Sequence, residues 1–158
     1  KLLEDILCMA RHPKLDQAAC GGAQGTPRIY KISDNQGRTA ANNDVNLVRE
    51  FERQPGPVYA IAFSPDGNLL GVGGVSNEVR VYRTSDGSRA ATLKGHEGAI
   101  FCVAFHPHRK EVVTAGYDGK VRIYDTISGN LITKFIPVPI KAAQQVAAAS
   151  EQPGAAQP

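Results

Sequence analysis

Three segments of the chain align with one another without a gap, and each carries a tyrosine near its end. The segments are Leu7–Lys31, Tyr59–Arg83 and Phe101–Asp125. An alanine, a proline, a glycine, an arginine and the tyrosine recur at the same offsets in all three. A repeat of this length is typical of folds built from copies of one small unit, which buries its apolar face only against its neighbours. The repeat therefore favours a surface assembled from copies over a single catalytic cleft.

Each unit has the pattern of four short β-strands separated by turn residues. In the third unit the residues 100–105 are apolar almost throughout, so we expect this strand to be covered on both faces. Asp118-Gly119 is a pair that favours a tight hairpin turn. The segment 64–67 of the second unit, Ser-Pro-Asp-Gly, also favours a turn, because proline fixes φ and glycine permits a positive φ. The pattern predicts an all-β protein.

The repeats also predict the domain organisation. Residues 1–136 form the repeat domain, and residues 137–158 are rich in alanine, glutamine and proline. The three units lie at about 6–52, 57–94 and 99–136. The last segment has too few large apolar residues to bury a core, so we expect a disordered tail or linker. We interpret the chain as a fragment of a longer protein.

Composition excludes some partners. The 18 lysines and arginines exceed the 15 acidic residues by only three, and they are spread along the chain, so we expect no nucleic-acid partner. No stretch approaches the roughly 20 apolar residues of a membrane helix. We therefore expect a soluble protein without a membrane partner, and both the cytoplasm and the periplasm are open as its compartment.

Two cysteines of the first unit could lie opposite each other. Folding this unit as a hairpin about Lys14 places Cys8 opposite Cys20. A disulfide between them is one interpretation. The other is a pair of reduced, buried thiols that behave as small apolar side chains, since cross-strand neighbours rarely have disulfide geometry.

The third unit resembles a WD40 repeat, which begins with Gly-His and ends with Trp-Asp. Gly95-His96 supplies the first pair, and Tyr124-Asp125 stands at the second, with tyrosine in place of tryptophan. The resemblance implies a β-propeller in which each unit is a four-stranded antiparallel blade. Three blades make only a partial, open ring, because propellers close with four to eight. Further blades are then expected from missing sequence or from another copy of the chain.

The resemblance also implies a buried polar tetrad of histidine, serine or threonine, aspartate and tryptophan. By position it corresponds to His96, Thr114, Asp118 and Tyr124. Such side chains satisfy one another's hydrogen bonds inside a blade. The other two units lack this set, and we expect them to depend on apolar packing.

Three further patterns have a chemical and a structural interpretation. His12, His106 and His108 could bind a metal, or lie in solvated turns. His96 with Thr114 and Asp118 has the composition of a nucleophilic triad, but its repeat position favours the structural tetrad. The recurring arginine–tyrosine pairs could stack on RNA, or form core and strand edge.

The resemblance implies a protein–protein interaction scaffold rather than an enzyme, with no cofactor. The predicted contact residues lie in the loops and at the first-strand starts at one end of the blades: Glu97, Tyr117, Gln54, Tyr59 and Phe101. One alternative is a sensor or scaffold segment of a larger bacterial multidomain enzyme or c-type haem protein. A further alternative is a homo-oligomeric propeller ring.

Overall fold

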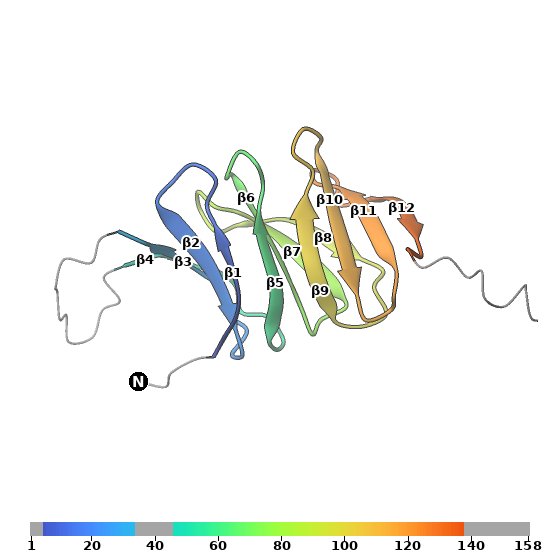
Figure 1. The fold of residues 1–158 in the computed structure, drawn as a ribbon, viewed down its shortest axis with the longest axis horizontal. Coiled ribbons are helices and arrows are strands. Elements are labelled where there is room, and N and C mark those ends of the chain that lie inside the picture. The colour runs from blue at the N-terminus through green and yellow to red at the C-terminus, as the bar shows by residue number, and fades with distance from the viewer. Residues whose placement is uncertain (1–4, 34–45, 138–158) are drawn as a thin grey trace, which may run out of the picture.

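The computed structural model describes residues 5–33 and 46–137, which form three four-stranded antiparallel β-sheets side by side (Figure 1). We call the sheets blades 1, 2 and 3. Blade 1 contains β1 (Ile6–Arg11), β2 (Gln17–Gly22), β3 (Arg28–Lys31) and β4 (Leu47–Glu50). Blade 2 contains β5 (Val58–Phe63), β6 (Leu69–Gly74), β7 (Glu78–Arg83) and β8 (Arg89–Lys94). Blade 3 contains β9 (Ile100–Phe105), β10 (Glu111–Gly116), β11 (Val121–Asp125) and β12 (Leu131–Phe135). The predicted all-β architecture of three four-stranded blades is confirmed; the predicted disordered tail lies outside the described residues.

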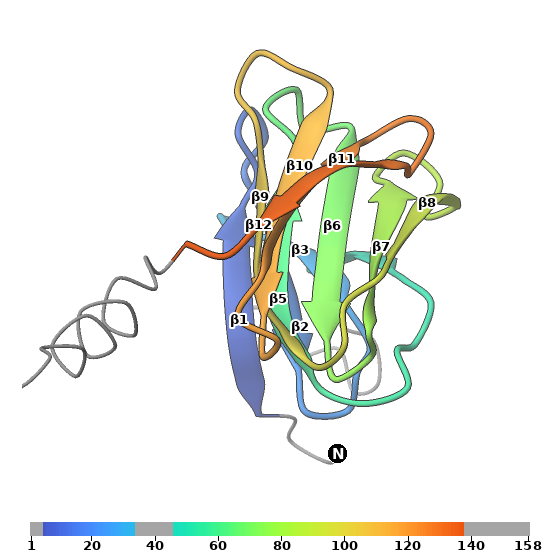
Figure 2. The same cartoon turned by 90° about the vertical axis from the view of Figure 1, so that its right-hand side faces the viewer.

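The strands of each blade follow their order in the sequence, so that each strand pairs with the next. The first strands β1, β5 and β9 lie side by side along the arc (Figure 1). Figure 2, turned by 90°, brings blade 3 to the front, with β12 nearest the viewer. Among the described residues, no helix is long and apolar enough to cross a membrane.

The apolar core lies between the blades. One buried cluster joins blades 1 and 2, and a second joins blades 2 and 3. The first contains Ala19, Ile29, Phe51, Val58, Ile61, Leu70, Val72 and Tyr82. The second contains Ala60, Val79, Val81, Leu93, Ile100, Val103, Val112 and Tyr124. Each fully buried aliphatic side chain contributes roughly 1.5–3 kcal/mol, so the contact between blades is the main source of stability.

The expectation that β9 is covered on both faces is wrong. Phe101 and Cys102 in this strand are exposed. Cys102 stands at the repeat position of Ala60, which is buried between blades 2 and 3. The difference arises because, within the described residues, no further blade packs on the outer face of blade 3.

The strand register separates Cys8 from Cys20. Cys8 lies opposite Gly21, whereas Cys20 lies opposite Met9, so the two thiols point to opposite faces of blade 1. Both cysteines are free. Burial raises the pKa of the Cys8 thiol to about 11, and this thiol donates to the carbonyl oxygen of Val58. The structure therefore supports the interpretation as reduced thiols.

The glycine that recurs at the end of each second strand allows two backbone segments to approach closely. A Cβ added at Gly74 would lie 2.1 Å from the carbonyl oxygen of Pro57. At the equivalent Gly116, a Cβ would lie 2.4 Å from the carbonyl oxygen of Ala99. In both blades the obstacle is backbone, which cannot move aside as a flexible side chain can.

Gly74→Ala should therefore lower the free energy of unfolding by about 1–3 kcal/mol. Gly56→Ala is a matched control, since a Cβ there meets its nearest atom, in Val75, at an ordinary 3.5 Å. The control should change stability by about 0.5 kcal/mol or less. Urea unfolding of both variants measures the difference, and equal effects would contradict the close-approach explanation.

Candidate protein-interaction face

The first strand of every blade contains a β-bulge at the same repeat position. The register skips one residue in each of these strands: between Ile6 and Cys8 in β1, between Val58 and Ala60 in β5, and between Ile100 and Cys102 in β9. The skipped residues are Leu7, Tyr59 and Phe101. An extra residue in one strand re-aims its side chain relative to the pleat. We call these three residues the bulge row.

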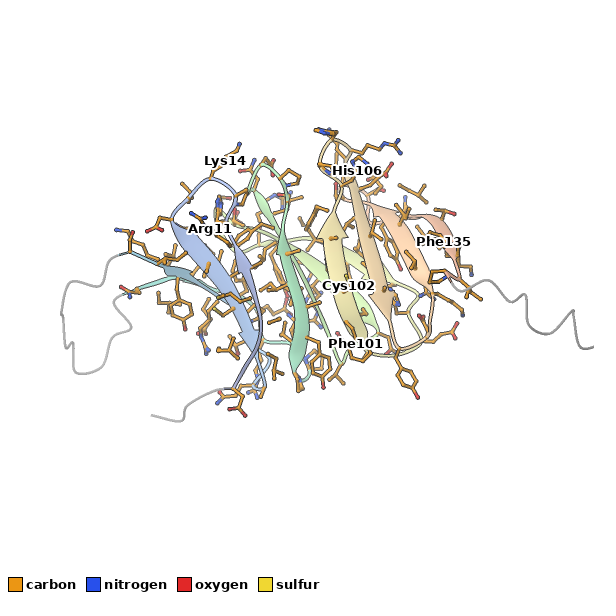
Figure 3. All side chains as sticks on the ribbon, in the orientation of Figure 1. Arg11, Lys14, Phe101, Cys102, His106 and Phe135 are labelled. Atoms are coloured by element: carbon orange, nitrogen blue, oxygen red, sulfur yellow. The ribbon has the colours of Figure 1, made fainter. Side chains whose placement is uncertain are left out.

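The bulge row is apolar and open to solvent. Leu7 is 47% exposed, Tyr59 36% and Phe101 54%. The rings of Tyr59 and Phe101 contact each other across blades 2 and 3, with centroids 5.6 Å apart. Figure 3 labels Phe101 at the lower end of β9. The structure thus brings two of the predicted contact residues together and adds Leu7, which sequence reasoning missed.

Two loops of blade 3 lie at the same end as the bulge row. The β8–β9 loop carries Glu97, and the β10–β11 turn carries Tyr117, which is 79% exposed. The amide of Tyr117 donates to the carbonyl of Ala99 at 2.8 Å. The Nζ of Lys120 lies 2.9 Å from a carboxylate oxygen of Glu97. These contacts hold the two loops next to each other, with Tyr117 and Glu97 both exposed.

The carboxylate of Asp118 ties the two loops together. One oxygen accepts the amide of Glu97 at 3.1 Å, and the other accepts the amide of Lys120 at 3.1 Å. Burial by itself raises the pKa of Asp118, but these amide bonds and the Arg122 guanidinium outweigh it and hold the pKa well below its usual range. Asp118 is therefore ionised near neutral pH and acts as a fixed acceptor.

Asp118 belongs to a buried network with three other side chains. The Nε2 of His96 lies 2.7 Å from the hydroxyl oxygen of Thr114, and its Nδ1 lies 3.3 Å from Asp118. The Nη1 of Arg122 donates to Asp118 at 2.6 Å and lies 2.9 Å from the Nδ1 of His96. The fourth residue of the predicted tetrad, Tyr124, donates instead to the carbonyl of Lys94 at 2.8 Å.

Arg122 is the residue that sequence reasoning missed in this network. The prediction assigned it to a solvated strand edge, but the structure buries it almost completely. The Nδ1 of His96 thus lies between the guanidinium of Arg122, which donates, and the carboxylate of Asp118, which accepts. Burial, followed by the charge of Arg122, lowers the pKa of His96, which agrees with a neutral ring.

The network has no route for a substrate. His96 contacts Thr114 with one ring nitrogen and Asp118 with the other, as the histidine of a nucleophilic triad does. The side chain of Thr114, however, is 0% exposed. A nucleophile must reach a reacting atom at about 3 Å, which this hydroxyl cannot do. The arrangement can hold loops in place, and its chemistry is that of a satisfied buried polar cluster.

Blade 2 replaces the network by a different set of contacts. Gln54, at the repeat position of His96, is 5% exposed and donates to the hydroxyl of Tyr82 at 2.8 Å. The structure therefore does not present Gln54 as a contact residue, because its amide is used inside the blade. Glu78 contacts Arg80 at 2.9 Å and provides the counter-charge that Asp118 provides in blade 3.

The histidines of the first-to-second strand turns serve as backbone acceptors. The Nδ1 of His12 accepts the amides of Lys14 and Leu15, and that of His106 accepts the amides of His108 and Arg109. Within residues 5–33 and 46–137, no three histidine, cysteine or acidic side chains gather as a metal site would require.

Comparisons with known proteins agree with this architecture. Residues 45–83 and 87–125 match the family model for the WD domain, G-beta repeat. WD repeat-containing protein 1 of Bos taurus is 35% identical over 89 residues, which make up 56% of this chain and 13% of that protein. The solved structure of the RRP9 WD40 repeats superimposes with a TM-score of 0.75 at 13% identity. That of U3-55K superimposes with a TM-score of 0.74 at 15% identity.

Each superposition covers 86% of this chain but only 40% of the solved chain, so the chain spans less than half of these structures. The two matched repeats are offset from the sheets by one strand. The first runs from β4 through β7, and the second from β8 through β11, so each ties the last strand of one blade to the next blade. The three blades and the two matched repeats define a β-propeller segment. The chain belongs to the WD40-repeat family.

The lowered pKa of His96 predicts that mild acid destabilises the fold. Its ordinary value is 6.5, so below that pH the unfolded state binds the proton more readily than the folded state. The stability linked to neutral His96 is fully present above about pH 6.5 and decreases as the pH falls through this value. We expect the urea midpoint of the wild-type chain to fall between pH 7 and pH 5.

His96→Gln should reduce the dependence of the urea midpoint on pH, which we call the pH slope, because the titrating group is gone. Glutamine is compatible with this position, since it occupies the equivalent position in blade 2. His108→Gln, at an exposed histidine, is the control and should keep the wild-type slope. Carboxylates whose pKa is lowered change the stability of the fold only at more acidic pH. An unchanged slope in His96→Gln would show that another group causes the acid sensitivity.

Proposed function

We propose that the chain is a non-catalytic protein–protein interaction scaffold and that a protein partner docks on the bulge row together with Tyr117 and Glu97. The observation that carries this proposal is the exposed row itself. Three independent bulges present an apolar or aromatic side chain to the same end of a rigid sheet array. Exposed tyrosine and phenylalanine are common anchor types at interfaces.

The polar residues beside the row suit a rim around such anchors. Glu97 and Lys120 form an exposed pair whose contribution to affinity is small, but whose charges orient a partner. We propose that the network of His96, Thr114 and Asp118 serves this face indirectly. It holds the two loops in one arrangement, so less entropy is lost when the partner binds.

A protein is favoured over a nucleic acid because the repeated arginines already have acidic partners. Arg28 lies 2.8 Å from Glu50, and Arg122 lies 2.6 Å from Asp118. Phosphate contacts need basic side chains that are available to the backbone of the nucleic acid. A role within a larger bacterial enzyme or c-type haem protein would use the same face, but the bovine relative gives the bacterial part of that alternative no support.

Phe101→Ala together with Tyr117→Ala should weaken partner binding by about 2 kcal/mol, or roughly thirtyfold. Peptides selected from a displayed library against the wild-type chain provide the probe. Leu15→Ala, an exposed leucine in the β1–β2 turn at the other end, is the matched control and should leave their affinity unchanged. If the selected peptides bind the double variant as tightly as the wild type, the proposal that this face is the binding site is refuted.

We also infer that further blades cover the outer faces of blades 1 and 3, supplied by a longer polypeptide or by a second copy of the chain. Phe135 stands at the repeat position of Leu93, which is fully buried between blades 2 and 3, yet Phe135 is exposed. Ile6 and Met9 stand at the positions of Val58 and Ile61, which blade 1 covers. Apolar patches of this kind mark interaction surfaces.

Light scattering and a hydrophobic dye test this inference on the purified chain. A mass of two chains would identify a second copy as the source of the blades. A mass of one chain with strong dye binding, reduced by Phe135→Lys, would assign the role to other sequence. A single chain that binds no dye would contradict the inference.

A further inference from the structure

A cleft of about 320 Å³ lies at the end of the blades opposite the bulge row, between the β5–β6 turn of blade 2 and the β9–β10 turn of blade 3. Figure 3 labels His106 beside it, at the upper end of the molecule. The β11–β12 loop forms a third wall. It is fixed by a hydrogen bond of 2.9 Å from the amide of Thr126 to the carbonyl of Lys110.

The cleft exists because one repeat position differs between the blades. Between blades 1 and 2 the same place is filled by His12, which is buried. Its ring lies 4.8 Å from that of Phe63 and covers Gly67. Between blades 2 and 3 the residue equivalent to His12 is Ser64, whose side chain is much smaller. The ring of Phe105, equivalent to Phe63, therefore lines an open space.

The cleft combines an apolar floor with a basic rim. Leu69 and Phe105 line the inside, and three exposed basic residues follow one another at the edge: His108, Arg109 and Lys110. Arg109 is 68% exposed, and its only acidic neighbour among the described ion pairs is Glu111 at 3.7 Å. The rim therefore presents exposed cationic side chains to a ligand, with Glu111 beside Arg109 and Asp125 within electrostatic reach of Lys110.

The one acidic residue that lines the cleft is already engaged. The carboxylate of Asp66 accepts the hydroxyl of Ser64 at 2.5 Å, the backbone amide of Asn68 at 3.1 Å and the side-chain amide of Asn68 at 2.7 Å. The first of these bonds is the main reason that the pKa of Asp66 is lowered. Asp66 is thus held in its own turn by neutral donors, away from an ion pair with the rim, although it keeps its negative charge.

We propose that this cleft binds an acidic peptide segment of a partner, with one apolar side chain on Leu69 and Phe105 and flanking carboxylates at Arg109 and Lys110. Charge complementarity selects an acidic segment, and the apolar floor requires a side chain that a simple anion lacks. The proposal does not depend on the bulge row, which lies at the other end of the blades.

A suitable probe is an acetylated, amidated pentapeptide with a central leucine flanked on each side by one aspartate and one glutamate. Titration into the ¹⁵N-labelled full chain should shift the amide signals of the non-proline residues within 64–69, 105–110 and 126–127. The peptide with alanine in place of leucine should bind about tenfold more weakly, which matches the loss of one buried aliphatic side chain. Equal affinity of the two peptides would show that binding depends on non-specific charge attraction alone and would overturn the proposal.

Three variants locate the site. Ser64→His restores the filling residue of the first junction and should abolish binding. Arg109→Ala with Lys110→Ala, which changes only exposed side chains, should weaken binding about fivefold. Lys14→Ala, in the corresponding turn of blade 1, is the control and should have no effect. Wild-type affinity in the Arg109/Lys110 double variant, or shifts outside the cleft, would refute the proposal even if Ser64→His does not fold.

Phe101→Ala with Tyr117→Ala separates this site from the proposed interaction face. This double variant should bind the acidic probe with wild-type affinity, because its two positions lie at the opposite end of the blades. A loss of acidic-peptide binding in it would place the probe on the bulge row and contradict a separate cleft site.

Discussion

The packing of one sheet face against the next is the constraint on which the rest of this protein depends. Both apolar clusters lie between blades, and the large rings of Tyr82 and Tyr124 are enclosed because a neighbouring blade covers them. The packing is so close that β6 contains glycine where a side chain would collide: a Cβ at Gly73 would lie 2.8 Å from Ile100 in the next blade. Such contacts leave little freedom for the blades to rotate, so they fix the ends of the strands from which the described loops start.

The two ends of the blades present different side chains. At one end, bulges in the first strands expose an apolar row, and the ionised carboxylate of Asp118 holds the neighbouring loops. At the other end, the side chain at the position of Ser64 decides whether a junction is filled or open. In the proposed function, the polar network in blade 3 acts through geometry, since Asp118 holds the β8–β9 loop and the β10–β11 turn to each other.

The fold could be predicted from the sequence because the residue pattern of each strand occurs in three copies. The partners of individual side chains could not. Residues 100–105 are apolar throughout, so no alternation of apolar and polar residues marks the bulge at Phe101. In blade 1 the register is set at the turn, where Arg11 lies opposite Ala18, so Cys8 faces Gly21 rather than Cys20. Gln54 has the polarity of a surface residue, and only the position of Tyr82, 28 residues away, explains its burial.

The arginine that recurs in every third strand shows why one repeat cannot be interpreted alone. Its side chain is 26% exposed at Arg28, 12% at Arg80 and 3% at Arg122. The acidic partner changes in step, from a glutamate on the neighbouring outer strand to a glutamate in the same strand and then to a buried aspartate in the turn. An arginine enters the interior only where a desolvated carboxylate meets it, since an unpaired buried charge costs several kcal/mol. The copies share a backbone arrangement, and the residues that differ between them determine which blade contains the buried polar network and which junction contains the cleft.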